Sequence, residues 1–239
     1  MTGPPEAATP GRGASHGGRD TGRQRVYRFL TLIVQVVLLA GVVWFVVLRD
    51  WRNALLTVLV IVLTMLPWFA RRLLRVDVPP AFQLVVAVFV FGANFLGTAL
   101  GFYGRFLWWD TALHTISGFM LGIVGFIVAF LVDGTDRRPE GIRISPLVAL
   151  FGFMFAVTLG VFWEIYEFVG DNLIPGLDMQ VVETGPTDTM VDLIAGTVGA
   201  AVVAVVGNVS GRTGRHSFIV DVVCAFIRRN PKLFLRRPE

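Results

Sequence analysis

The sequence predicts an all-α protein, a polytopic membrane bundle of about six transmembrane helices. Of its 239 residues 54% are hydrophobic and only 16% are charged, a balance typical of membrane proteins. Six apolar runs each have roughly 17 to 25 residues, the length that crosses the hydrocarbon core as a helix. These runs are continuously apolar and lack the alternating pattern of membrane β-barrel strands, so helices are expected.

The apolar runs divide the chain into three parts. The expected helices are 29–48, 53–70, 81–103, 113–132, 147–168 and 190–207. Residues 1–25 contain almost no large apolar side chain, which predicts a disordered cytoplasmic tail and not a cleaved signal peptide. Residues 26–208 form the transmembrane domain, and 209–239 form a basic cytoplasmic tail. Apolar residues within 216–229 recur at helical spacing, which predicts an amphipathic helix on the inner leaflet.

The basic residues predict the orientation of the bundle, because loops rich in Lys and Arg stay in the cytoplasm. Basic residues gather before the first helix, after the second, after the fourth and after the sixth, in 12–28, 71–75, 137–143 and 212–237. The opposite loops contain only Arg49, Arg52 and Arg105. We therefore expect a multi-pass protein of the plasma membrane with both termini in the cytoplasm.

The same charges limit the partners that the chain can have. A net charge of +4 could suggest nucleic acid, but a positive cytoplasmic face accounts for it. No nucleic-acid-binding module is recognisable in the sequence, so we expect membrane lipids as partners and no nucleic acid. Cys224 is the single cysteine, which excludes an intrachain disulfide. The sequence leaves the oligomeric state open.

Small residues at four-residue spacing predict close contacts between helices of one molecule. The pairs are Gly97 with Gly101, Gly118 with Gly122, and Gly196 with Ala200. Such spacing lets two helix backbones approach each other in a membrane.

Ionisable residues gather at the outer ends of three predicted helices. Asp110 and His114 begin the fourth helix, Glu164, Glu167 and Asp171 end the fifth, and Asp188 and Asp192 begin the sixth. Spacings of three and four residues place each set on one face of its helix. With a rise of about 1.5 Å per residue, the three sets also lie at similar depth. Ionisable groups are costly in hydrocarbon, so their convergence predicts a functional site.

Crowded carboxylates need protons or a bound cation to offset their charge. A divalent metal ion could be held by a mixed nitrogen and oxygen set that suits zinc or manganese, namely His114, Glu164, Glu167 and Asp192. The same four residues are the candidate catalytic groups. Asp110, Asp171, Asp188 and Thr189 would line the mouth of the site. The alternative is structural: Asp110 and Asp188 cap their helices, while His114 and Asp192 form hydrogen bonds between helices.

Three strings in this region carry a family resemblance. They are Asp110-Thr-Ala-Leu-His114 followed by Ser117-Gly118-Phe119, Trp163-Glu164-Ile-Tyr-Glu167-Phe168, and Asp188-Thr189-Met-Val-Asp192-Leu193. Together they resemble the YjdF-type family of uncharacterised bacterial inner-membrane proteins and, more distantly, the VanZ-like family. The resemblance extends from the third helix to the sixth and implies no particular reaction. The VanZ-like link with glycopeptide tolerance would suggest the cell envelope, but the chain departs from that pattern in its Trp-Glu and Asp-Thr strings.

Three classes of function remain open. An envelope enzyme would act at the outer leaflet on a lipid or lipid-linked substrate, with His114 as base or metal ligand and Glu164 or Glu167 as acid or ligand. A structural or accessory protein would use the polar cluster to set helix register. A proton- or cation-coupled carrier would need polar groups that continue toward the cytoplasm, and the helices are apolar beyond His114 and Asp192.

The orientation can be tested by cysteine labelling. In a variant whose Cys224 is replaced by serine, a cysteine at Asp178 should react with an impermeant maleimide added outside intact cells, because its loop contains no Lys or Arg. A cysteine at Arg236 should react only after the cells are permeabilised. Labelling at position 178 from the cytoplasm alone would reject both the orientation and the outer-leaflet site.

Overall fold

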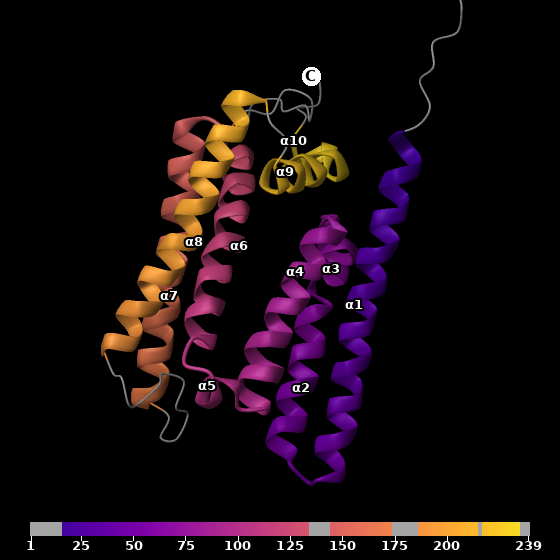
Figure 1. Ribbon diagram of the computed structural model, residues 1–239. Coiled ribbons are helices and arrows are strands. Elements are labelled where there is room, and N and C mark those ends of the chain that lie inside the picture. The colour runs from indigo at the N-terminus through magenta and orange to yellow at the C-terminus, as the bar shows by residue number, and fades with distance from the viewer. Residues whose placement is uncertain (1–15, 134–143, 174–185, 215–216, 235–239) are drawn as a thin grey trace, which may run out of the picture.

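The computed structural model describes residues 16–133, 144–173, 186–214 and 217–234, and all regular elements within these ranges are helices (Figure 1). In chain order they are α1 (His16–Val47), α2 (Trp51–Thr64), α3 (Leu66–Phe69), the π-helical η1 (Ala70–Leu74), α4 (Pro80–Val90), the π-helical η2 (Phe91–Ala99), α5 (Phe102–Arg105), α6 (Trp109–Asp133), α7 (Pro146–Leu173), α8 (Pro186–Thr213), α9 (Phe218–Arg229) and α10 (Pro231–Phe234). The predicted all-α class is confirmed.

The helices agree with the expected spans except at two places. Five helices within the described ranges are long and apolar enough to cross a membrane, and the second expected span is a pair bent by 41° between α2 and α3. Pro67 lies in the first turn after the bend, where proline is tolerated because it needs no hydrogen-bond donor. The third span ends at Ala99 and not at Tyr103, because Gly101 takes a left-handed conformation with φ of 70°.

The first helix is longer than its apolar run. It begins at His16, so residues 16–25, which we expected in a disordered tail, are helical, while residues 1–15 lie outside the described ranges. Adding residues to an existing helix costs far less than nucleating one, which explains how a polar segment extends the helix beyond the span that starts at Gln24.

The spans form two groups (Figure 1). In the first group α1, α2 and the continuous α4 and η2 enclose a small apolar core of Leu38, Phe45, Ala54, Val60 and Phe95. In the second group α6 packs along both α7 and α8, around a larger core that includes Ile123, Phe126, Phe130 and Val203. All the ionisable residues predicted to form the site lie on this second group.

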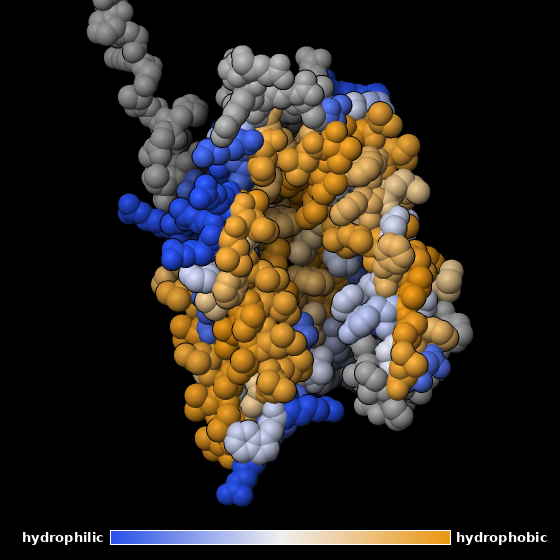
Figure 2. Space-filling model, turned by 180° about the vertical axis from the view of Figure 1, so that it is seen from behind, coloured by the Kyte–Doolittle hydropathy of each residue, from blue (hydrophilic) through white to orange (hydrophobic). Residues whose placement is uncertain are grey.

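The outer surface of both groups is apolar. Large side chains such as Leu55 (72% exposed), Leu147 (75%) and Val205 (62%) point outward, and Figure 2 shows a broad hydrophobic face. Soluble monomers rarely expose so continuous an apolar surface, whereas lipid chains require it.

Close contact between α6 and α8 depends on glycine. A Cβ added at Gly118 would overlap the Gly196 carbonyl oxygen, and one added at Gly199 would overlap the Thr115 carbonyl oxygen. A Cβ at Gly122 would come within 3.1 Å of the Val203 side chain. These contacts confirm the intramolecular packing predicted for Gly118, Gly122 and Gly196.

The pair Gly97 and Gly101 has a different role. A Cβ at Gly97 would meet the ring of Tyr103, and Gly101 forms the left-handed turn before α5. Gly97 therefore makes room for a side chain from the next short helix, and the pair does not bring two spans together as we expected.

The amphipathic helix exists as α9, but its apolar face packs on the protein and not on the inner leaflet. Ile219, Val222, Val223, Phe226 and Ile227 are all buried in the larger core, where α9 contacts α6 and α8. The helices leave an apolar surface at this end that α9 covers, so protein contacts replace the lipid contacts that its pattern predicted.

The residue after α9 joins the two groups of helices. The buried Asn230 side chain accepts a 2.7 Å hydrogen bond from the Asp77 backbone N–H and donates a 2.9 Å hydrogen bond to the Asp77 carbonyl oxygen. Beside it, the Arg229 Nη1 atom lies 3.2 Å from the Asp77 Oδ2 atom. Asp77 precedes α4, so the C-terminal segment holds the first group to the second.

The contact between α6 and α8 can be tested with one methyl group. Gly118→Ala should lower the free energy of unfolding by roughly 1–3 kcal/mol, because the added Cβ meets backbone atoms that cannot rotate away. Gly160→Ala is the control, since nothing lies within 4 Å of its added Cβ and alanine favours a helix. Melting temperatures of the two purified variants should therefore differ, and equal values would contradict the packing.

Candidate functional site

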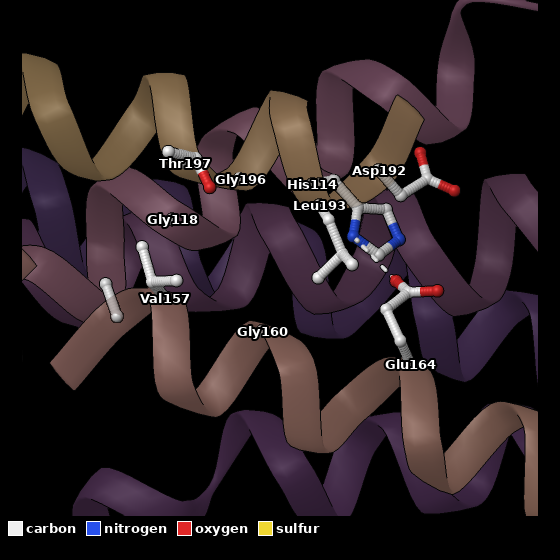
Figure 3. A pocket seen from close by; sticks show the side chains of 10 residues that line it. His114, Gly118, Val157, Gly160, Glu164, Asp192, Leu193, Gly196 and Thr197 are labelled. Atoms are coloured by element: carbon white, nitrogen blue, oxygen red, sulfur yellow. Dashed lines mark ion pairs between the residues drawn. The ribbon is translucent and has the colours of Figure 1, made fainter. Parts of the chain in front are cut away.

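His114 is the centre of the acidic cluster. Its Nε2 atom lies 3.5 Å from the Asp110 Oδ1 atom on the preceding turn of α6, and its Nδ1 atom lies 3.6 Å from the Glu164 Oε1 atom on α7. Figure 3 shows the imidazole between Glu164 and Asp192 of α8. Three helices thus bring their ionisable side chains to one point, as their depth and spacing predicted.

The glycine contacts explain why the helices meet there. Gly118 lies four residues after His114, and Gly196 lies four residues after Asp192, so the α6–α8 backbone contact is one helical turn below both side chains. Gly160, four residues before Glu164 on α7, lines the same cavity but makes no such close contact. Gly118 and Gly196 let α6 and α8 converge, and the polar side chains meet above them.

Two of the carboxyl groups are buried. Glu164 and Asp192 are each 4% exposed. The Thr189 side chain is hydrogen-bonded to the Glu164 carboxyl group, yet Glu164 Oε1 forms no hydrogen bond with the described residues. A buried polar atom without a partner costs about 1–3 kcal/mol, and more when it is charged. This oxygen therefore needs a proton or a cation that the side chains around it do not supply.

The cluster contains two candidate sets of metal ligands that share His114. One is Asp110, His114 and Asp192, and the other is His114, Glu164 and Glu167; within each set the possible ligand atoms lie within 4.8 Å of one another. Ligands about 2.0–2.1 Å from a tetrahedral metal lie roughly 3.4 Å apart. The 3.5 and 3.6 Å separations at His114 are close to that value and too long for good hydrogen bonds.

The space inside the cluster is small. A cavity of about 20 Å³ is lined by His114, Glu164 and Asp192 together with the glycines below them (Figure 3). A cavity of this size holds about one water molecule. It fits a single ion, and a larger ligand would have to bind at its rim.

Glu167 lies at that rim. Its Oε1 atom accepts a 2.9 Å hydrogen bond from Trp163 Nε1, one turn earlier on α7. The tryptophan is 49% exposed, so this hydrogen bond orients the carboxyl group at the outer surface of the bundle. Asp171, one turn further along α7, is half-buried and belongs to neither ligand set.

The remaining predicted mouth residues lie in the first turn of α8. Thr189 reaches Glu164, as described, and Asp188 is half-buried beside it. Arg105, the basic residue nearest in sequence, is exposed on α5. Position 178 and the rest of the loop between α7 and α8, residues 174–185, lie outside the described ranges.

Tyr103 is a member of the site that the sequence did not reveal. Its pKa is raised, first by burial and then by the negative charges of Asp110, Glu167 and Asp192. It lies on α5, between two membrane spans, with its ring against Gly97. Gly101, which forms the left-handed turn just before α5, is the sequence signal that could have indicated it.

Comparison with known proteins gives the chain a family. Residues 30–213, which include every helix of the site, match the family described as "Predicted membrane protein (DUF2238)". The chain belongs to this DUF2238 family. An uncharacterised protein of Thermotoga maritima is 28% identical over 138 residues, which cover 58% of this chain and 67% of the relative. No solved structure matches the chain.

The position of Tyr103 predicts a specific loss of stability in alkali. An unfolded tyrosine ionises near pH 10. The raised pKa of Tyr103 means that the folded state keeps its proton above that pH, so the stabilising contribution is present below about pH 10 and is lost as the pH rises toward the folded pKa. The melting temperature should thus fall more steeply between about pH 10 and 12 for the wild type than for Tyr103→Phe. Parallel curves would show that Tyr103 does not face the acidic cluster.

Proposed function

We propose that this DUF2238 protein binds a divalent metal ion at His114. The observation that carries the proposal is the buried Glu164 Oε1 atom, which has no hydrogen-bond partner among the described residues and lies 3.6 Å from a histidine nitrogen. A metal ion would interact with both atoms and would offset the charge of the neighbouring carboxylates. Imidazole with carboxylate oxygens is a donor set that suits zinc, manganese or iron.

The ligands would come from His114, Glu164 and Glu167, whose possible ligand atoms lie within 4.8 Å of one another, while Asp192 belongs to the other set with Asp110 and His114. Asp110 would then act on the other side of the imidazole. Its carboxylate lies 3.5 Å from Nε2, so its negative charge favours a proton on that nitrogen and leaves Nδ1 free to face Glu164. This arrangement resembles the carboxylate–histidine–metal order that orients ligands in many metal sites.

We further propose that the metal supports chemistry on a lipid or lipid-linked substrate at the outer leaflet. A bound divalent metal can polarise an ester or phosphoryl oxygen and lower the pKa of a water molecule. Because the cavity is about 20 Å³, the substrate would approach the rim at Glu167, Asp188 and Tyr103 and would not enter the bundle. The location in the outer leaflet rests on the excess of basic residues in the loops predicted to be cytoplasmic.

The YjdF-type resemblance is compatible with membership of the DUF2238 family, and neither supplies a reaction. The VanZ-like resemblance would connect the chain with glycopeptide tolerance, but it rests only on the three sequence motifs around His114, Glu164 and Asp192. The proposal therefore depends on the site alone.

A structural or accessory role is the second candidate, and the small cavity favours it. A cluster that holds one proton or ion and no substrate could serve only to align α6, α7 and α8. A carrier is less well supported, because no ionisable residue follows His114 on α6 before Asp133, precedes Glu164 on α7, or follows Asp192 on α8 before Arg212. A polar path across the membrane would need such residues.

Metal analysis of the purified protein tests the cation proposal. Wild-type protein equilibrated with zinc or manganese and then desalted should retain close to one ion per chain, whereas His114→Ala should retain none because it removes the nitrogen ligand. Glu164→Gln removes a carboxylate ligand and should also retain less metal. Its matched control is Asp50→Asn, which removes one carboxylate from the other helix group and preserves the N-cap of α2. Equal metal content in all four proteins would reject the site.

Stability measured on the same variants separates the two candidate functions. For a metal-dependent enzyme, Glu164→Gln should abolish complementation of an envelope defect and leave the apo-protein melting temperature nearly unchanged. For a structural cluster, the same change should cost about 1–3 kcal/mol of stability, and activity should return on overexpression. If Glu164→Gln is unstable and overexpression restores activity, the enzyme hypothesis is rejected. Metal binding is then decided by the metal analysis alone.

A further inference from the structure

We propose that a groove on the first helix group binds the headgroup of an anionic phospholipid, in the leaflet at the α9 end of the molecule. The groove has a volume of about 380 Å³, far larger than the cavity at His114. It lies between α1, the bent segment after α2, and the start of α4. Its polar lining consists of Arg28, Thr31, Gln35, Thr64, Trp68 and Gln83.

The polar residues of α1 lie on one face and within a membrane span. Arg28, Thr31 and Gln35 are spaced by three and four residues, inside the span Gln24–Val47. From Arg28 to Gln35 the helix rises about 10 Å. Apolar neighbours such as Phe29 (61% exposed) and Val36 (58%) point outward. Polar groups are thus collected in the groove while the rest of this helix suits lipid chains.

These side chains keep hydrogen-bonding capacity that the protein does not use. Gln35 Nε2 lies 3.5 Å from Thr64 Oγ1, at the limit of a hydrogen bond, and the Thr64 hydroxyl donates to the Ile61 carbonyl oxygen. Gln83 Nε2 donates to the Val78 carbonyl oxygen. The second amide hydrogens and the Arg28 guanidinium remain available to phosphate or ester oxygens.

The charge of the groove selects an anion. Arg28 is the charged residue of the lining, and among the described residues that line the groove there is no Asp or Glu. Arg25 lies one turn before it, and Arg71 and Arg72 follow Trp68 on η1; all are exposed. Figure 2 shows a strongly hydrophilic patch at this end, next to the hydrophobic face. A phosphate in the groove would face Arg28 and no described carboxylate of the lining, with further basic residues near in sequence.

The position of the groove favours a lipid over a soluble anion. Leu32 (54% exposed) and Met65 (36%) line the same groove as Arg28, so polar and lipid-facing surfaces are continuous. Trp68 is 55% exposed at the polar end, where tryptophan typically meets lipid headgroups. Basic pockets between membrane helices bind anionic headgroups in this way, with the acyl chains along the apolar exterior.

Lipid retention by the full chain tests the assignment. Protein should be extracted gently from vesicles of equal phosphatidylglycerol and phosphatidylcholine, and bound lipid measured by native mass spectrometry. Wild-type protein should retain phosphatidylglycerol in preference to phosphatidylcholine. Arg28→Gln should lower that preference about five-fold, the contribution of one basic residue near a membrane surface. Arg105→Gln, which removes the same charge at the opposite end of the molecule, should leave it unchanged.

A second variant blocks the groove without changing its charge. Thr31→Phe fills the space beside Arg28 and should lower phosphatidylglycerol retention as well, even if Arg28→Gln cannot be purified. Equal retention of the two lipids by wild-type protein, equal losses in Arg28→Gln and Arg105→Gln, or wild-type selectivity in Thr31→Phe would each overturn the proposal. Displacement of the lipid by millimolar inorganic phosphate would show that the groove is a site for free phosphate and would overturn the lipid assignment. None of these results depends on metal binding at His114.

Discussion

The backbone contact between α6 and α8 is the constraint on which the candidate site depends. Where Gly118 meets Gly196, no side chain separates the two helices. One turn above, the backbone contact brings the side chains of His114 and Asp192 into the same small volume. An ionisable pair placed this deep in an apolar bundle must be neutralised, so the packing of small residues creates the chemical requirement that the site then has to meet.

The fold was predictable because a membrane imposes few and strong constraints. Length and hydropathy are sufficient to locate spans, and they did so for α6, α7 and α8. They could not locate the end of the third span, since Gly101 ends the helix by a left-handed turn that hydropathy does not register. They also could not tell that α9 packs on protein: an apolar stripe is the same whether lipid or a neighbouring helix covers it. The helical segment 16–25 was missed because composition predicts a polar tail and ignores the helix that it extends.

The candidate site was predictable to the level of which residues meet, and no further. Helical periodicity and depth brought Asp110, His114, Glu164, Glu167 and Asp192 together without any tertiary information. Tyr103 could not be found in this way, because its position depends on a turn and on the missing side chain of Gly97. The division of the cluster into two ligand sets and the unpartnered Glu164 Oε1 atom depend on side-chain conformations, which spacing does not determine.

The two helix groups meet at both ends of the molecule, and the contacts differ in kind. At the end that carries the acidic cluster, Trp109 Nε1 donates a 3.3 Å hydrogen bond to the Gly92 carbonyl oxygen, which joins the start of α6 to η2. At the other end, Asn230 and Arg229 hold Asp77, so the segment that follows and ends α9 joins the two groups there. The acidic cluster belongs wholly to the second group and the basic groove wholly to the first. A lipid bound in the groove could therefore stabilise the first group without contacting the residues around His114, and its effect on them would pass through contacts between the groups such as Trp109 with Gly92 and Tyr103 with Gly97.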